Sequence, residues 1–101
     1  MKKIFRIMAN YKIYNDELRD SSNRTIGKLY NDEIRDSSNR TVIKIYGDEF
    51  RDSSNRTIAK MYNDEVRNSS NSKIASLSDI RRIIDGPGGK SLVAFWLAFL
   101  R

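Results

Sequence analysis

The chain has 101 residues, contains neither cysteine nor histidine, and carries a formal net charge of +6. The absence of these two residue types excludes a disulfide framework, zinc sites built on cysteine or histidine, and serine–histidine or cysteine–histidine catalysis. The length predicts one domain with a modest hydrophobic core.

The positive charge is unevenly distributed along the chain. Residues 14–77 contain 11 basic and 11 acidic residues, so the basic excess comes from the two ends. A nucleic-acid-binding array typically carries its basic residues as a stripe along the repeated face. Because every Arg and Lys of the central region has acidic neighbours in the sequence, we do not expect nucleic acid as a partner.

The amino end, Met1-Lys2-Lys3-Ile4-Phe5, is similar to the beginning of a signal peptide. Arg6 and Asn10 interrupt its apolar stretch, however, and no small-residue cleavage site follows. The apolar run from Leu92 to Leu100 has about half of the ~20 residues that a membrane-spanning helix needs. We therefore expect a cytoplasmic protein.

Four consecutive blocks of sixteen residues are nearly identical. Each begins with a tyrosine, and they occupy residues 14–29, 30–45, 46–61 and 62–77, after a partial repeat at residues 4–13. A short fixed period indicates that each block is one supersecondary unit, which buries its apolar side only against its neighbours. We therefore predict a repeat array over residues 1–77 and a separate carboxyl-terminal segment over residues 78–101.

The four copies indicate which positions of the repeat belong to the core. Three positions vary only among apolar side chains, which is typical of core positions where volume matters more than identity. They are the fifth (Leu18, Ile34, Phe50, Val66), the thirteenth (Ile26, Val42, Ile58, Ile74) and the sixteenth (Leu29, Ile45, Met61, Leu77). The fourteenth position is mostly small, with Gly27, Ile43, Ala59 and Ala75.

A first turn follows the tyrosine of each block. Three copies have Asn at this point, and the third copy has Gly47 instead. An exchange of Asn for Gly predicts a residue with positive φ, as in a tight turn. Short β-prone stretches lie between the turns, for example at residues 33–36 and 41–46, so we expect two short strands in each repeat.

A second turn has the sequence Asp-Ser-Ser-Asn-Arg, in which Asn39 and its equivalents can adopt the left-handed conformation. The last block replaces the Asp with Asn68 and the Arg with Ser72. The joint loss of two opposite charges predicts an ion pair such as Asp36 with Arg40. The alternative is that the last block is a degenerate terminal cap of the array, since it also replaces Thr with Lys73 and Lys with Ser76.

Two β topologies fit this pattern. In a β-solenoid-like stack, equivalent residues lie about 4.8 Å apart, whereas in an antiparallel β-meander they lie about twice as far apart. Stacks of like charges disfavour the solenoid. The thirteenth and sixteenth positions differ in parity, which disfavours a meander unless a bulge lies near the small fourteenth position. We expect a mainly β fold of tandem repeats, solenoid-like, with the antiparallel β-meander as the alternative.

The motif Arg-Asp-Ser-Ser-Asn-Arg-Thr, found at residues 19–25 and in the next two blocks, resembles tandem repeats of uncharacterised bacterial proteins. The resemblance extends over roughly residues 4–77. It implies a β-solenoid-like or β-sheet array, and it brings no known activity.

The period ends after residue 77, and two short helices are predicted beyond it. Ser78 can cap the first helix, on which Ile80, Ile83 and Ile84 share one face. The sequence Gly-Pro-Gly-Gly at residues 86–89 then interrupts the helical pattern. Ser91 can cap the second helix.

The second helix, which runs to Arg101, is apolar nearly all round. One stripe of it is formed by Leu92, Phe95, Trp96, Phe99 and Leu100. A helix of this kind is usually buried, so we expect it to pack on the array as a lid. A self-association seam and reversible insertion into a membrane surface are the alternatives.

Each block also places three carboxylates within five residues, as at Asp48, Glu49 and Asp52. Such a group could hold Ca²⁺, but Arg51 lies between the carboxylates and favours a solvated charged turn. Nothing distinguishes one carboxylate pair as catalytic. We therefore expect no enzymatic activity, no metal and no cofactor. A hydrolase that uses Asp and Glu is the least favoured hypothesis.

The expected function is a non-enzymatic structural or protein-interaction module that self-associates or binds another protein. Flat β arrays have open edges, which an oligomer seam would cover. The alternative is peripheral membrane binding through the last helix and the basic amino end. The candidate interaction surface consists of the helical stripe (Leu92, Phe95, Trp96, Phe99, Leu100) and the tyrosine row (Tyr14, Tyr30, Tyr46, Tyr62).

Overall fold

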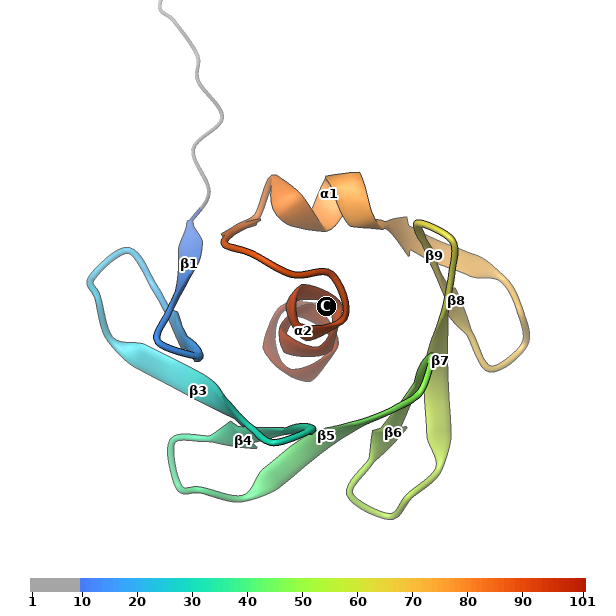
Figure 1. The fold of residues 1–101 in the computed structure, drawn as a ribbon, viewed down its shortest axis with the longest axis horizontal. Helices are drawn as coiled ribbons and strands as arrows, with labels where there is room; N and C mark the ends of the chain where they lie inside the picture. The colour runs from blue at the N-terminus through green and yellow to red at the C-terminus, as the bar shows by residue number, and fades with distance from the viewer. Residues whose placement is uncertain (1–9) are drawn as a thin grey trace, which may run out of the picture.

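The computed structural model describes residues 10–101, which form one curled sheet of ten strands around a helical segment (Figure 1). Most of the predicted partial repeat at residues 4–13, and most of the basic amino end, therefore lies outside the described residues. The strands are β1 (Tyr11–Tyr14), β2 (Glu17–Arg19), β3 (Thr25–Tyr30), β4 (Glu33–Asp36), β5 (Thr41–Tyr46), β6 (Glu49–Asp52), β7 (Thr57–Tyr62), β8 (Glu65–Asn68), β9 (Lys73–Ser76) and β10 (Ile84–Asp85).

The sheet is an antiparallel meander from β1 to β9, with β10 added in parallel beside β1. The mainly β class, the repeated strand pairs and the short carboxyl-terminal helices are confirmed. Of the two predicted topologies, the meander is formed and the solenoid-like stack is not. A meander places an intervening strand between equivalent residues, so identical charges of successive copies do not lie directly opposite one another.

A β-bulge in every copy accounts for the parity of the apolar positions. Gly27 pairs with Leu18, but Thr25 pairs with Arg19, so Ile26 is an extra residue opposite β2. The same shift recurs between β4 and β5, between β6 and β7, and between β8 and β9. Because a bulge adds one residue to its strand, the thirteenth and sixteenth positions can both face the core. Side chains at both positions pack against the core.

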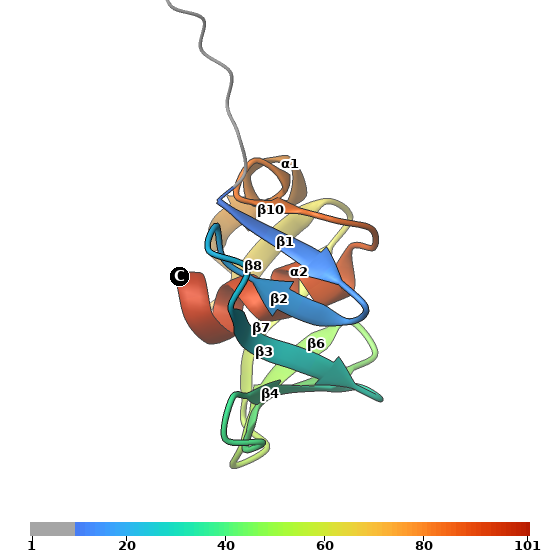
Figure 2. The ribbon, with the colours of Figure 1, turned by 90° about the vertical axis from the view of Figure 1, so that its left-hand side faces the viewer.

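The two kinds of turn have the backbone conformations that the sequence predicts. In the tight turns, the residue after the tyrosine has a φ between 52° and 64° (Asn15, Asn31, Gly47, Asn63). In the longer loops, the asparagine has a φ between 66° and 69° (Asn23, Asn39, Asn55, Asn71). All tight turns lie at one end of the curled sheet and the longer loops lie at the other, because the strands alternate in direction (Figure 2).

The core lies on the inner face of the sheet. The fifth position is fully buried in every copy (Leu18, Ile34, Phe50, Val66). The fourteenth position is also buried (Gly27, Ile43, Ala59, Ala75), whereas the thirteenth and sixteenth are only partly buried. The core prediction is thus confirmed for the fifth position, but it understated the fourteenth, which lies closer to the centre of the molecule.

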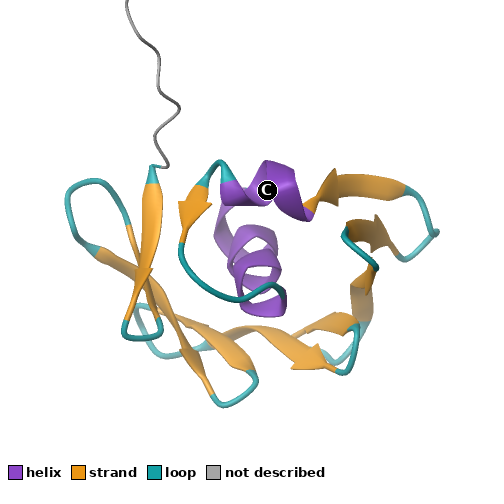
Figure 3. Cartoon of the chain, turned by 45° about the horizontal axis from the view of Figure 1, so that its top comes forward, coloured by secondary structure: helices purple, strands orange, loops and turns teal. Residues whose placement is uncertain are grey.

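Helix α1 (Leu77–Arg81) lies between the two edges of the sheet, β9 and β10 (Figures 1 and 3). Its cap is Ser76 and not Ser78, since the Ser76 side chain accepts a hydrogen bond from the backbone of Asp79 in a capping box. The helix ends before Ile84, which is buried in β10 opposite Tyr11. The sheet itself does not close, and α1 fills the gap.

Helix α2 (Lys90–Phe95) continues as a π-helical segment, η1 (Trp96–Leu100), and the sheet curves round both (Figure 1). Its cap is Gly89, without a side-chain hydrogen bond, so the prediction of a Ser91 cap was wrong. Residues 92–95 are fully buried. A Cβ atom at Gly27 would lie 2.5 Å from the Phe99 ring, so the small fourteenth residue lets the helical segment approach β3.

Candidate interaction surface

The outer, convex side of the sheet carries the same kinds of side chain in successive copies. In the first copy they are Tyr14, Glu17, Arg19, Thr25 and Lys28. Glu17 pairs with Tyr14 on one side and with Lys28 on the other, and Arg19 pairs with Thr25. Since residues directly opposite one another share a face, all five point outward, away from the core.

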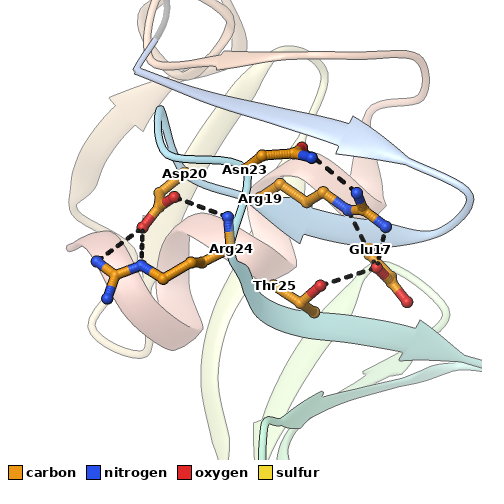
Figure 4. A network of polar contacts seen from close by, with 6 residues as sticks. All are labelled: Glu17, Arg19, Asp20, Asn23, Arg24 and Thr25. Carbon is orange, nitrogen blue, oxygen red and sulfur yellow. Dashed lines mark hydrogen bonds and ion pairs between the residues drawn. The ribbon is translucent and has the colours of Figure 1, made fainter.

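A hydrogen-bond network fixes the arginine of each copy (Figure 4). Glu17 Oε1 accepts hydrogen bonds from Arg19 Nε at 3.1 Å, from Arg19 Nη2 at 2.9 Å and from Thr25 Oγ1 at 2.9 Å. Arg19 Nη1 donates to Asn23 Oδ1 at 3.3 Å. The next two copies repeat these contacts around Glu33 and Glu49. The guanidinium group is therefore held in one orientation.

Each fixed arginine lies over the tyrosine of its own copy. The distances from the Arg Cζ atom to the ring centroid are 4.8, 4.4, 4.1 and 4.6 Å for Tyr14, Tyr30, Tyr46 and Tyr62. The same four tyrosines, here called the tyrosine row, are between 53 and 62% exposed. Each ring is thus supported on one side by a cation and remains largely open to solvent.

The glutamates of this network are set up to stay ionised. In Glu17, Glu33 and Glu49, a hydrogen bond from the Thr hydroxyl lowers the carboxyl pKa below its usual value, and the Arg hydrogen bonds lower it further. The direction is opposite to that expected of a general acid, whose pKa is raised. These carboxylates hold the arginines in place.

The longer loops have their own local network. In the second copy, Asp36 Oδ1 accepts hydrogen bonds from the backbone N–H groups of Ser38 at 2.9 Å and Arg40 at 3.0 Å. The predicted ion pair is confirmed, with Arg40 Nε 3.3 Å from Asp36 Oδ2. In the last copy Asn68 accepts the same two backbone hydrogen bonds. An amide oxygen therefore preserves the loop after the ion pair is lost.

The two halves of the predicted interaction surface lie in different places. The tyrosine row is on the convex face. In the helical stripe, Leu92 and Phe95 are fully buried, and Trp96, Phe99 and Leu100 are partly buried against the core. The outward Glu, Arg, Thr and Lys side chains were not predicted, although they recur in register with the tyrosine in at least three copies.

Within residues 10–101, no three carboxylates lie close enough together to hold a metal ion. A shallow pocket is lined by Asp64, Leu77, Ser78 and Arg81. No helix in this part of the chain is long and apolar enough to cross a membrane.

Comparison with known proteins identifies a family. No curated protein and no solved structure matches the chain significantly. The family model described as "5-fold beta-flower protein" matches residues 7–88, which include the four repeats, α1 and β10 and end before α2. The resemblance to tandem β-repeat proteins is thereby confirmed, and this match over most of the chain shows that the protein is a structural repeat module of the 5-fold beta-flower family.

Proposed function

We propose that this chain is a non-enzymatic interaction module that binds proteins, further copies of itself included, through the tyrosine row. The observation that carries the proposal is the support of each exposed ring by an arginine that is itself fixed by hydrogen bonds. Tyr and Arg are among the side chains most enriched at interface hot spots. Side chains held in place before binding lose little conformational entropy when a partner docks.

The repetition of this unit adds to the argument. Four equivalent tyrosines recur at intervals of two strands, or roughly 10 Å. A partner that meets several of them gains from multivalency, because the later contacts form within one complex. A weak contact at each ring is therefore sufficient for association.

A non-enzymatic role is supported by the state of the carboxylates. Hydrogen bonds from neighbouring groups lower the pKa values of three glutamates and three aspartates, Glu17, Glu33, Glu49, Asp20, Asp36 and Asp52. A catalytic acid needs a carboxyl group whose pKa is raised in a cleft. The regular convex face provides each glutamate with an arginine partner in place of a cleft.

Membrane-surface binding through the last helix has less support. Its apolar stripe packs inside the sheet, so the helix would have to leave the core before it could insert. The same argument applies to a self-association seam along this helix. Open sheet edges also give less support to self-association than expected, because α1 lies between the edge strands β9 and β10 (Figure 3).

Light scattering after size exclusion tests the proposal. We expect the mass of the wild-type chain to exceed that of a monomer and to rise with protein concentration. The triple variant Tyr30→Ser, Tyr46→Ser, Tyr62→Ser should remain monomeric and should melt close to the wild type, because these rings are more than half exposed.

The matched control replaces three exposed loop serines, Ser21→Ala, Ser37→Ala and Ser53→Ala, and should retain the wild-type mass. A wild-type monomer up to millimolar concentration would refute self-association. Equal masses of the wild type and the tyrosine variant above the monomer value would show that association uses another surface.

A further inference from the structure

The fold separates charges that alternate in the sequence. The aspartates of the repeats lie in the tight turns and at the start of the longer loops, whereas the outer face of the sheet carries nine basic and five acidic residues, a net charge of +4. The basic residues are Lys12, Arg19, Lys28, Arg35, Lys44, Arg51, Lys60, Arg67 and Lys73, and the acidic ones are Glu17, Glu33, Glu49, Glu65 and Asp85. The acidic neighbours seen in the sequence are thus not all neighbours on the surface.

The lysines of this face are less closely paired with carboxylates than its arginines are. Each arginine is paired with the glutamate of its own strand at 2.9 to 3.1 Å. Within residues 10–101, no carboxylate lies within ion-pair distance of the lysine row, which is defined as Lys12, Lys28, Lys44 and Lys60. On one side each of these lysines lies directly opposite a carboxylate, which is Asp85, Glu17, Glu33 or Glu49 in turn, and the three glutamates already accept hydrogen bonds from an arginine. On the other side each lysine lies directly opposite an arginine, a like-charge pair that an anionic partner would relieve.

The shape of the face restricts the partner. A rigid partner with a flat surface touches a convex sheet over only one or two copies. A flexible chain can follow the curve and meet several lysines and tyrosines in succession (Figure 1). A second folded copy of the chain therefore meets only one or two of the tyrosines, whereas a ligand that uses the whole face at once is extended, flexible and negatively charged.

Two features favour a polypeptide over a nucleic acid. A glutamate recurs between successive lysines, which disfavours an uninterrupted run of phosphates but suits carboxylates spaced along a peptide. One face of each tyrosine ring is covered by an arginine, which reduces the surface available for base stacking. We infer that the lysine and tyrosine rows together bind a flexible acidic segment of a partner protein; this rests on the proposed function, since it uses the same face.

Fluorescence anisotropy with the full chain tests this inference. The probe is a labelled peptide of alternating Glu and Ser, about 12 residues long, which spans three ~10 Å intervals at ~3.3 Å per residue. We expect binding at low salt that weakens as salt is added. A peptide with Gln in place of Glu should not bind.

Two triple variants separate a local effect from one of net charge. Lys28→Gln, Lys44→Gln, Lys60→Gln should weaken binding about tenfold, since three modest charge contacts are lost. Arg24→Gln, Arg40→Gln, Arg56→Gln removes the same charge from loop residues that are 78 to 80% exposed, and should bind as the wild type does. Thermal unfolding of both variants verifies that each is folded.

Three results would overturn the inference: no binding of the Glu–Ser peptide, equal weakening in both variants, or tighter and lysine-dependent binding of an oligothymidylate of similar length. None of them bears on the mass measurement with the tyrosine variant. If the peptide fails to bind while that variant still loses self-association, the inference is wrong and the proposed function stands.

Discussion

The inner and outer faces of the sheet follow opposite rules. On the inner face, the fifth position is Leu18, Ile34, Phe50 or Val66, and the fourteenth ranges from glycine to isoleucine. On the outer face, the tyrosine, glutamate and arginine are identical in all four copies. Here the surface is uniform and the core is varied, the reverse of the pattern usual among related domains.

The difference arises from what each face contacts. An outer side chain contacts only residues of its own copy and of the next strand, so each copy repeats one network. Inner side chains pack into one core with residues of α1, α2 and η1, which are not repeated, so successive copies have different neighbours. Gly27 leaves room for Phe99, whereas the equivalent residue on β5 is Ile43. Repetition thus survives where contacts are local.

The largest effect is expected in the core that the inner face of the sheet encloses, at Phe95 of α2. Phe95→Ala removes a fully buried ring and should lower the free energy of unfolding by about 3–5 kcal/mol. Urea denaturation measures this change. Tyr46→Ala on the outer face is the matched control and should lose much less, because that ring is 62% exposed. Equal losses of unfolding free energy in the two variants would show that the core and the outer face do not differ in their contribution to stability.

A smaller effect is expected where the helical segment approaches the sheet. At Gly27, a Cβ would lie 2.5 Å from the Phe99 ring and 2.7 Å from the Arg35 carbonyl oxygen, so Gly27→Ala should cost about 1–3 kcal/mol. A double-mutant cycle with Phe99→Leu should reveal coupling, with partial relief of the clash. Strict additivity would mean that the two residues do not meet.

The longer loops contain a natural substitution, since the last copy has Asn68 where the other copies have Asp. Asp36→Ala removes the acceptor of two backbone hydrogen bonds and should lower the midpoint of urea denaturation. Asp36→Asn removes only the exposed ion pair and should have little effect, as the natural Asn68 indicates. A similar loss for both substitutions would make the ion pair, and not the backbone hydrogen bonds, the source of loop stability.

The smallest effect is expected on the pH dependence of stability, through the pKa of Glu33 in the outer hydrogen-bond network. The pKa of Glu33 in the folded chain lies below its usual value of 4.5, so its stabilisation is present above that pH and is lost as pH falls through the lower, folded-state value. Thr41→Val should raise this pKa, because the largest lowering contribution comes from the Thr41 hydroxyl. NMR titration of Glu33 measures the shift, with Glu49 as the unchanged reference. A constant Glu33 titration would refute the network.

Several features were predictable because they depend on residues close in sequence. The exchange of Asn for Gly47 indicated positive φ, and the joint change to Asn68 and Ser72 indicated the Asp36–Arg40 contact. The predicted helix caps failed although they are local, since Ser76 competes with Ser78 as a cap two residues away. Which of the two serines caps the helix depends on where β9 ends, and β9 ends at Ser76.

The sequence by itself determined the repeat, its short strands, its turns and its mainly β class, because each of these arises from contacts within one sixteen-residue copy. Only the tertiary structure decided between meander and solenoid, enclosed the last helix in the sheet, and gathered the lysines on the convex face away from the turn aspartates. These outcomes depend on which strands pair and how the bulges curve the sheet. Such pairings join residues far apart in the chain, and four nearly identical copies carry no local signal that selects among them.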